Sequence, residues 1–185
     1  MTPLVSTASD VQIQNTTVHL NREDITELEV DGFVYYAQPN LALGSGTGGA
    51  IAVRGGASIQ KELDALVEGG TIPTGQAVVS GGGKLKAKHI IHAVGPRFRE
   101  PETEAKLRNT VSSCLQRAEE EGMRTLAFPV MGSGYYGIPP EVSAAIMLEG
   151  FQKHLVGGSK LEEIFICALD TPQFKSVEAA MAALG

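Results

Sequence analysis

The sequence predicts a single α/β domain, a three-layer α/β/α sandwich around a central mixed, mostly parallel sheet. Its 185 residues are the size of one domain. Short apolar runs bounded by glycine or proline alternate with segments whose apolar residues recur at helical spacing. No internal repeat or low-complexity linker divides the chain, so residues 1–185 are expected to form one domain, with residues 1–9 as a loose N-terminal lead-in.

The expected strands are short stretches rich in β-branched and apolar residues. A β-favouring stretch covers residues 11–20, and further strands are expected over 32–37, 74–79, 88–94, 125–128 and 164–169. Apolar residues at helical spacing predict helices over 59–67, 107–118, 139–146 and 177–184, and another helix is expected from residue 50. Because helices separate most of these strands, the strands are expected to run mostly parallel.

The charge and cysteine content exclude several functional classes. A net charge of -6 lacks the basic footprint of broad nucleic-acid binding, so a nucleic-acid partner is not expected. Cys114 and Cys167 form no metal-binding pattern with the histidines, and we expect neither a metal nor a cofactor. The start of the chain does not resemble a signal peptide, and no apolar run reaches the length of a membrane span. A cytoplasmic protein is therefore expected.

Two glycine-rich segments, residues 44–49 and 130–137, each follow an expected strand and precede an expected helix. In open α/β sheets, ligands bind outside the carboxyl ends of the strands. Backbone N–H groups and helix N-termini bind anions there without net positive charge. Neither segment carries the Gly-Lys-Ser/Thr ending of a Walker A loop, and the first does not fit the dinucleotide fingerprint. The two segments together predict a clamp for a diphosphate.

From about residue 18 onward, the order of these segments resembles the macrodomain family. Residues 21–26 are similar to its Gly-Asp-Ile-Thr segment, with Glu23 in place of the glycine. Residues 41–51 resemble the first phosphate loop, in which Ser45 breaks the glycine run, and residues 128–137 resemble the second. The resemblance implies that the partner is ADP-ribose, free or attached to a protein.

The resemblance also assigns roles to individual residues. Asp24 falls on the aspartate that accepts a hydrogen bond from the adenine amino group, and Tyr136 on the aromatic residue beside the distal ribose. Either Leu169 or Phe174 covers the adenine, although Phe174 equally fits an anchor for the last helix. The expected ligand-binding residues are Asp24, Ile25, Gln38, Asn40, Gly44, Ser45, Gly46, Thr47, Gly48, Val130, Gly132, Ser133, Gly134, Tyr135, Tyr136, Leu169 and Phe174.

The chain departs from the family at the positions of its catalytic side chains. Hydrolases of the family usually carry Asn-Ala-Ala-Asn where residues 35–38 read Tyr-Tyr-Ala-Gln, and their first-loop aspartate corresponds to Gly48. The catalytic residues are therefore unknown, with Gln38 and Asn40 as candidates.

These departures leave three hypotheses open. One is binding of ADP-ribose with little or no turnover. Another is hydrolysis of an ADP-ribosylated protein, O-acetyl-ADP-ribose or ADP-ribose 1''-phosphate. A third is a different ligand, another nucleotide or single-stranded nucleic acid, if Tyr35 and Tyr36 reshape the cleft. The net charge of -6 makes a nucleic-acid ligand the weakest of these.

Overall fold

A computed structural model describes residues 10–184, which form one seven-stranded mixed sheet in the order β1-β2-β7-β6-β3-β5-β4. The strands are β1 (Asp10–Ile13), β2 (Thr16–Asn21), β3 (Gly32–Tyr36), β4 (Gln76–Gly81), β5 (His89–Val94), β6 (Thr125–Pro129) and β7 (Glu163–Cys167). The pairs β2·β7, β7·β6, β6·β3 and β3·β5 are parallel, whereas β1·β2 and β4·β5 are antiparallel. The predicted mixed, mostly parallel sheet is confirmed.

The β-favouring stretch over residues 11–20 is a hairpin of two strands. Its turn lies between Ile13 and Thr16, where Gln14 adopts a φ of 53°. A non-glycine residue with positive φ is uncommon in regular strands and typical of a tight turn. The hairpin places β1 at the outer edge of the sheet, beyond β2.

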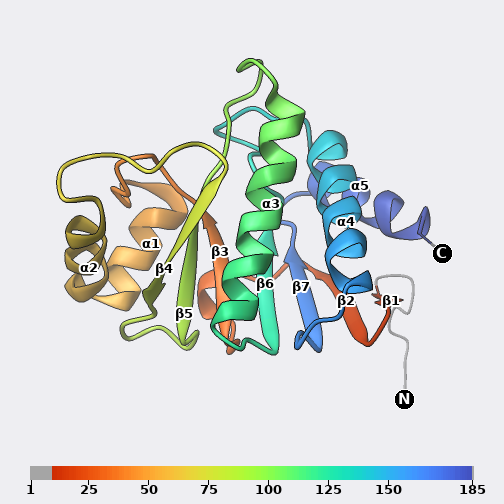
Figure 1. The fold of residues 1–185 in the computed structure, drawn as a ribbon, viewed down its shortest axis with the longest axis horizontal. Helices are drawn as coiled ribbons and strands as arrows, with labels where there is room; N and C mark the ends of the chain where they lie inside the picture. The colour runs from red at the N-terminus through yellow and green to blue at the C-terminus, as the bar shows by residue number, and fades with distance from the viewer. Residues whose placement is uncertain (1–9, 185) are drawn as a thin grey trace.

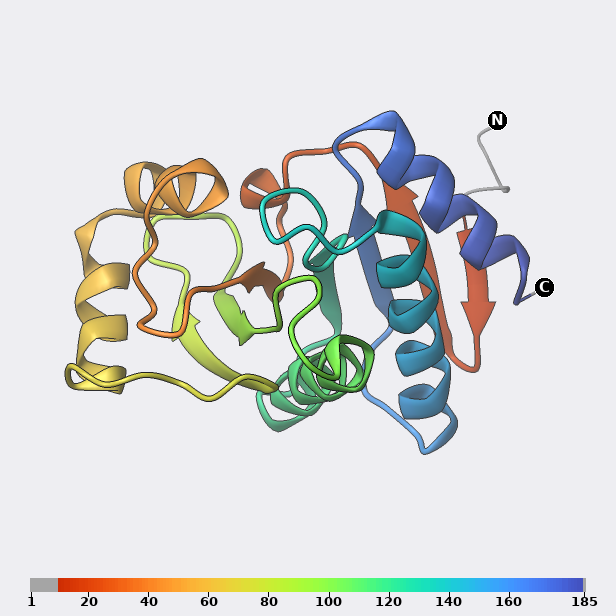
Figure 2. The ribbon, with the colours of Figure 1, turned by 90° about the horizontal axis from the view of Figure 1, so that it is seen from above.

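Helices cover both faces of the sheet, which confirms the three-layer sandwich (Figure 1). The helices are a 3-10 turn η2 (Ile25–Glu27), α1 (Gly46–Gly55), α2 (Ala57–Val67), α3 (Thr103–Glu120), α4 (Pro140–Val156) and α5 (Thr171–Ala182). Buried side chains of α3, α4 and α5 pack into one core, and those of η2, α1 and α2 pack into a second core. Seen from above, α1 and α2 lie together at the opposite end of the molecule from α5 (Figure 2).

The topology gathers four loops at one edge of the sheet. Strands β2, β7, β6 and β3 are neighbours and run parallel, so their carboxyl ends lie side by side. The segments that follow these strands contain η2, the first glycine loop, the second glycine loop and the start of α5. This is the edge at which open α/β sheets bind ligands. Within residues 10–184, no helix is both long and apolar enough to cross a membrane.

Candidate functional site: a cleft at the carboxyl ends of the strands

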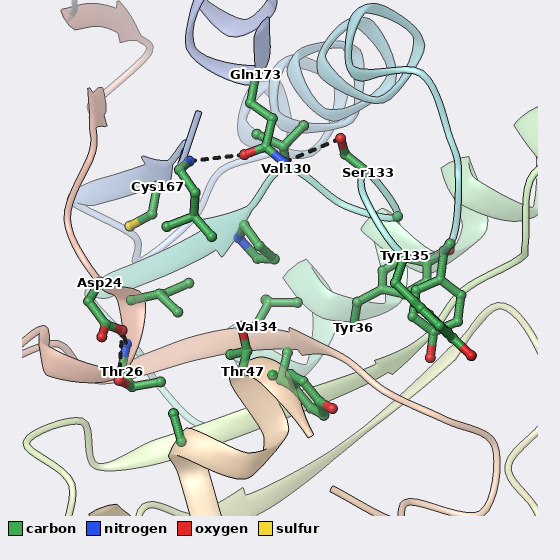
Figure 3. A pocket seen from close by; sticks show the side chains of 18 of the residues that line it. Asp24, Thr26, Val34, Tyr36, Thr47, Val130, Ser133, Tyr135, Cys167 and Gln173 are labelled. Carbon is green, nitrogen blue, oxygen red and sulfur yellow. Dashed lines mark hydrogen bonds between the residues drawn. The ribbon is translucent and has the colours of Figure 1, made fainter. Parts of the chain in front are cut away.

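The four loops enclose a cleft with a volume of about 790 Å³ (Figure 3). Ligand pockets for drug-sized molecules typically measure about 300 to 1,000 Å³. The cleft extends from Asp24 and Thr26 on one side to Tyr135 and Tyr36 on the other. Its lining residues are Arg22, Asp24, Ile25, Thr26, Val34, Tyr35, Tyr36, Gln38, Leu43, Ser45, Gly46, Thr47, Ala50, Pro129, Val130, Gly132, Ser133, Tyr135, Tyr136, Cys167, Leu169 and Gln173.

Asp24 is a fixed and ionised hydrogen-bond acceptor at one end of the cleft. It caps η2: its Oδ1 accepts from the Thr26 N–H at 3.0 Å and from the Thr26 hydroxyl at 2.7 Å. Arg54, from α1, donates through Nη1 to Asp24 Oδ2 and to Thr26 Oγ1, both at 2.6 Å. Partial burial alone raises the pKa of Asp24, but the hydrogen bonds from Arg54 and Thr26 bring that pKa below its usual value. The carboxylate therefore only accepts hydrogen bonds near neutral pH.

The first glycine loop leads directly into helix α1. Ser45 has an extended backbone and precedes the helix, which begins at Gly46, earlier than the expected start at residue 50. The first N–H groups of an α-helix have no acceptor within the helix and favour anions. Ser45, Gly46 and Thr47 all line the cleft. The loop therefore brings the start of a helix, whose first N–H groups have no acceptor within the helix, to the cleft. Anion binding by such groups needs no basic side chain.

Gly48 lies within the first turn of α1 at a position with no room for a side chain. A Cβ there would lie 1.7 Å from the carbonyl oxygen of Leu43 and 2.4 Å from the Tyr35 hydroxyl. These two groups are joined, since the Tyr35 hydroxyl donates to the Leu43 carbonyl at 3.0 Å. Burial raises the pKa of Tyr35 to about 12, so this hydroxyl keeps its proton. The backbone therefore excludes an aspartate at Gly48, and Gly48 itself is not among the lining residues.

The second glycine loop is folded tightly on itself after β6. The Ile138 N–H donates to the Gly132 carbonyl at 2.9 Å, and Gly132 has a φ of 73°. A Cβ at Gly132 would lie 2.4 Å from the Ile138 side chain, so both conformation and space require glycine there. Gly134 also has a positive φ, 85°, but a Cβ there would meet open space. Gly134 does not line the cleft.

A side-chain bridge ties the second loop to the start of α5. Gln173 donates through Nε2 to the Ser133 hydroxyl at 3.3 Å, and its Oε1 accepts from the Leu169 N–H at 2.9 Å (Figure 3). One amide group therefore holds the loop after β6 against the loop after β7. Gln173 lines the cleft, although nothing in the sequence predicts it as a site residue.

A group of tyrosines forms the other end of the cleft. Tyr36 and Tyr136 pack with ring centroids 4.7 Å apart, and Tyr135 meets Tyr136 edge-on at 5.2 Å. Tyr36 is buried and donates to the Pro96 carbonyl at 2.5 Å, and burial raises its pKa. Tyr135, in contrast, is 82% exposed. Tyr36 is thus a core residue that also lines the cleft. Tyr35 lines the cleft as well, and its hydrogen bond to Leu43 connects it to the first loop.

Several predicted site residues lie outside the cleft. Asn40 accepts from the Ala42 N–H at 3.0 Å in an exposed turn and does not line the cleft, and Gly44 does not line it either. Phe174, in α5, packs against the core, with the Arg22 guanidinium carbon 4.7 Å from its ring centre. Leu169 is the residue of that pair that lines the cleft. The other predicted residues that line it are Asp24, Ile25, Gln38, Ser45, Gly46, Thr47, Val130, Gly132, Ser133, Tyr135 and Tyr136.

Cys167 and Arg22 also line the cleft, although the sequence does not predict them as site residues. Cys167 is buried, and this burial raises its pKa to about 12, so it is a neutral thiol without nucleophilic character. Within residues 10–184, no group of three or more histidine, cysteine, aspartate or glutamate side chains is arranged to hold a metal ion.

The sheet order and the cleft define an α/β sandwich of the macrodomain type. A variant of the Oceanobacillus iheyensis macrodomain, solved with ADPR, superposes on this chain with a TM-score of 0.87. The match covers 95% of this chain and 97% of that chain. The two sequences are 24% identical, so the match shows a similarity in fold. The macro domain family model matches residues 36–147, more than half of the chain. The chain therefore belongs to the macro domain family.

Two relatives show how far the sequence likeness extends. A macro domain-containing protein of Caldanaerobacter subterraneus is 38% identical over 83% of this chain and 89% of its own length. A Xenopus laevis protein named ADP-ribose glycohydrolase MACROD2 is 34% identical over 90% of this chain, but the match spans only 41% of the relative.

Proposed function

We propose that this chain binds ADP-ribose, free or attached to a protein, in the cleft, with little or no turnover. The observation that carries the proposal is the arrangement of the cleft. A fixed carboxylate, Asp24, lies at one end, aromatic side chains lie at the other, and a glycine loop borders each side between them. A nucleoside diphosphate joined to a second sugar has the matching order of groups: a base with an amino donor, two phosphates and a distal ribose.

The adenine fits the Asp24 end because of hydrogen-bond polarity. An ionised carboxylate accepts hydrogen bonds and cannot donate. Adenine offers an amino donor at the position where hypoxanthine or guanine carries a carbonyl oxygen. Because Thr26 and Arg54 already hold both oxygens of Asp24 in place, the acceptor is preorganised before ligand binds. This end of the cleft should therefore prefer adenine to guanine or hypoxanthine.

The diphosphate fits between the two glycine loops, where backbone donors substitute for basic side chains. The start of α1 supplies N–H groups without acceptors and the positive end of the helix dipole. The tight fold of the second loop around Gly132 brings a second stretch of backbone to the cleft. This arrangement accounts for anion binding by a protein with a net charge of -6.

Low turnover follows from the side chains at the catalytic positions. Gly48 cannot be replaced by an aspartate in this backbone, because a side chain would meet the Leu43 carbonyl. Tyr35 uses its hydroxyl to hold that same carbonyl. Gln38 is the one candidate catalytic side chain that lines the cleft, and a neutral amide is not a general base.

Calorimetric titration with ADP-ribose tests the binding proposal, with ADP, AMP and NAD as controls. We expect ADP-ribose to bind more tightly than AMP, because AMP lacks the second phosphate and the distal ribose. Substitution of Asp24 by alanine should cost about 1 to 3 kcal/mol of binding free energy, through the loss of a charged hydrogen bond. Absence of heat with millimolar ADP-ribose, from a protein shown to be folded, would overturn the proposal.

Hydrolysis of ADP-ribose derivatives is the second candidate, favoured by the 34% identity to a relative named ADP-ribose glycohydrolase. In this case Gln38 would steer the distal ribose, and a water molecule held by the ligand's diphosphate would attack. Single-turnover assays on an ADP-ribosylated protein, O-acetyl-ADP-ribose and ADP-ribose 1''-phosphate separate the two candidates. Release of ADP-ribose well above the buffer rate, lost in a Gln38→Ala variant that still binds ADP-ribose, would establish the enzyme.

A further inference from the structure

Arg22 is an arginine whose position on the cleft is not explained by an ion pair. Within residues 10–184, no carboxylate oxygen lies within 4.0 Å of its side-chain nitrogens. Arg54 offers the contrast, since it pairs with both Asp24 and Glu27. Arg22 instead lies with its guanidinium carbon 4.7 Å from the centre of the Phe174 ring, and its Nη2 donates to the Thr171 hydroxyl at 3.3 Å. Two contacts to α5 thus hold the guanidinium in place.

Arg22 borders the cleft and also contacts Phe174. Arg22 lines the cleft, whereas Phe174 does not and packs against the core cluster. A guanidinium is planar and stacks on aromatic faces. The Arg22 guanidinium carbon lies over the Phe174 ring, and Arg22 lines the cleft. Asp24, which marks one end of the cleft, follows two positions later in the sequence.

We propose that Arg22, supported by Phe174, forms part of the base subsite by presenting its guanidinium plane to the adenine. The inference rests on the proposed function, which places the adenine at the Asp24 end. Leu169, one of the two residues expected to cover the adenine, is 66% exposed and has no aromatic face of its own. The Phe174 ring therefore contributes to base recognition indirectly, by fixing the plane of Arg22.

The competing role for Arg22 is simple attraction between its positive charge and the diphosphate. The two roles differ in what they require of the side chain. Stacking requires a flat group, whereas attraction requires only a charge. A lysine keeps the charge and loses the plane. Attraction between exposed charges also weakens with salt, because the screening length falls from about 14 Å to about 4 Å between roughly 0.05 and roughly 0.5 M.

The experiment is calorimetric titration of ADP-ribose into the full chain and four variants, Arg22→Lys, Arg22→Ala, Phe174→Leu and Arg124→Ala, at both salt concentrations. Arg22→Lys and Arg22→Ala are the tests. Arg124→Ala is the matched control, because Arg124 is an exposed arginine paired with Glu162 just before β6, at the opposite edge of the sheet. Arg124→Ala removes the same charge as Arg22→Ala, but at a residue that does not line the cleft. Thermal unfolding of each variant checks that the fold is intact.

We expect Arg22→Lys and Arg22→Ala to weaken ADP-ribose binding by a similar factor, about two- to fivefold at either salt concentration. Arg124→Ala should leave the affinity unchanged. Phe174→Leu should weaken binding to the same degree as Arg22→Lys although it changes no charge, because it removes the support for the plane.

Each contrary outcome identifies what has failed. Full affinity in Arg22→Lys, with a loss in Arg22→Ala that disappears at high salt, would assign Arg22 to charge attraction and overturn the inference. Unchanged affinity in both Arg22 variants would overturn it as well. If the unmodified chain itself fails to bind ADP-ribose, the proposed function fails, and the inference fails with it.

Discussion

Replacement of Gly48 by alanine adds a single methyl group in the first turn of α1, at a position with no room for a side chain. The new Cβ would lie 1.7 Å from the Leu43 carbonyl oxygen and 2.4 Å from the Tyr35 hydroxyl. Real Cβ atoms essentially never come within 3.0 Å of such neighbours, so something must move. The Leu43 carbonyl belongs to the backbone of the first loop and is held there by Tyr35. The loop must therefore shift away from α1.

The cost can be built from three contributions. Forcing a methyl group into a packed site costs about 1 to 3 kcal/mol. Loss of the hydrogen bond from Tyr35 to Leu43 costs about 1 kcal/mol more. The change from glycine to alanine inside a helix returns roughly 0.5 to 1 kcal/mol. The expected loss of unfolding free energy is thus about 1 to 3.5 kcal/mol, and displacement of the loop donors should weaken ADP-ribose binding about tenfold or more.

Urea unfolding and calorimetric titration measure the two effects, and Gly49→Ala is the matched control. Gly49 lies in the same turn of α1, but a Cβ there would lie 3.3 Å from the Gly44 carbonyl, a contact that a shift of a few tenths of an ångström relieves. We expect this control to stay within about 0.5 kcal/mol of the unmodified chain. The reasoning is refuted if Gly48→Ala is as stable as Gly49→Ala and binds ADP-ribose equally well.

Three further predictions concern groups around the cleft and in the core. Arg54→Met should weaken ADP-ribose binding about threefold. Because Arg54 lowers the pKa of Asp24, the same variant should also lose binding at a higher pH than the unmodified chain, which binding titrations from pH 3 to 7 measure. Gln173→Ala should free Ser133 and increase amide hydrogen exchange in the second loop, and unchanged exchange would contradict this. Burial lowers the pKa of His92 to about 4, so the folded state resists the proton that the unfolded state takes up below about pH 6.5. The free energy of unfolding should therefore fall by roughly 3 kcal/mol between pH 6.5 and 4, and His92 should cause no further loss below pH 4. In urea unfolding, a His92→Gln variant should lack this dependence of the unfolding free energy on pH.

The parts of the fold that the sequence predicts are those encoded locally. Strand β5 is a continuous apolar run around His92, and it ends at Gly95-Pro96, which cannot extend it. The two glycine loops are predicted because two glycine clusters each follow an expected strand and precede an expected helix. The hairpin turn at Gln14 was missed, since glutamine is not a typical residue for positive φ.

The contacts that hold the site together were not predictable in the same way. Arg54 reaches Asp24 from a helix 30 residues later, and Gln173 reaches Ser133 across 40 residues. Each is a long polar side chain on an otherwise ordinary helix, and nothing in its local pattern distinguishes it from a solvated residue. Such partners become visible only when the sheet order brings the carboxyl ends of β2, β6 and β7 together.

The structure makes the departures at Tyr35 and Gly48 interdependent. Tyr35 holds the Leu43 carbonyl over Gly48, so an asparagine at 35 would free that carbonyl, and an aspartate at 48 requires that it be free. Gly48→Asp should therefore be less destabilising in a Tyr35→Asn background than alone, with a coupling energy of about 1 kcal/mol or more in a double-mutant cycle measured by urea unfolding. Purely additive effects would show that the two positions changed independently. Coupling would mean that the first loop is built around a tyrosine and a glycine together, and that an aspartate at position 48 does not fit unless Tyr35 also changes.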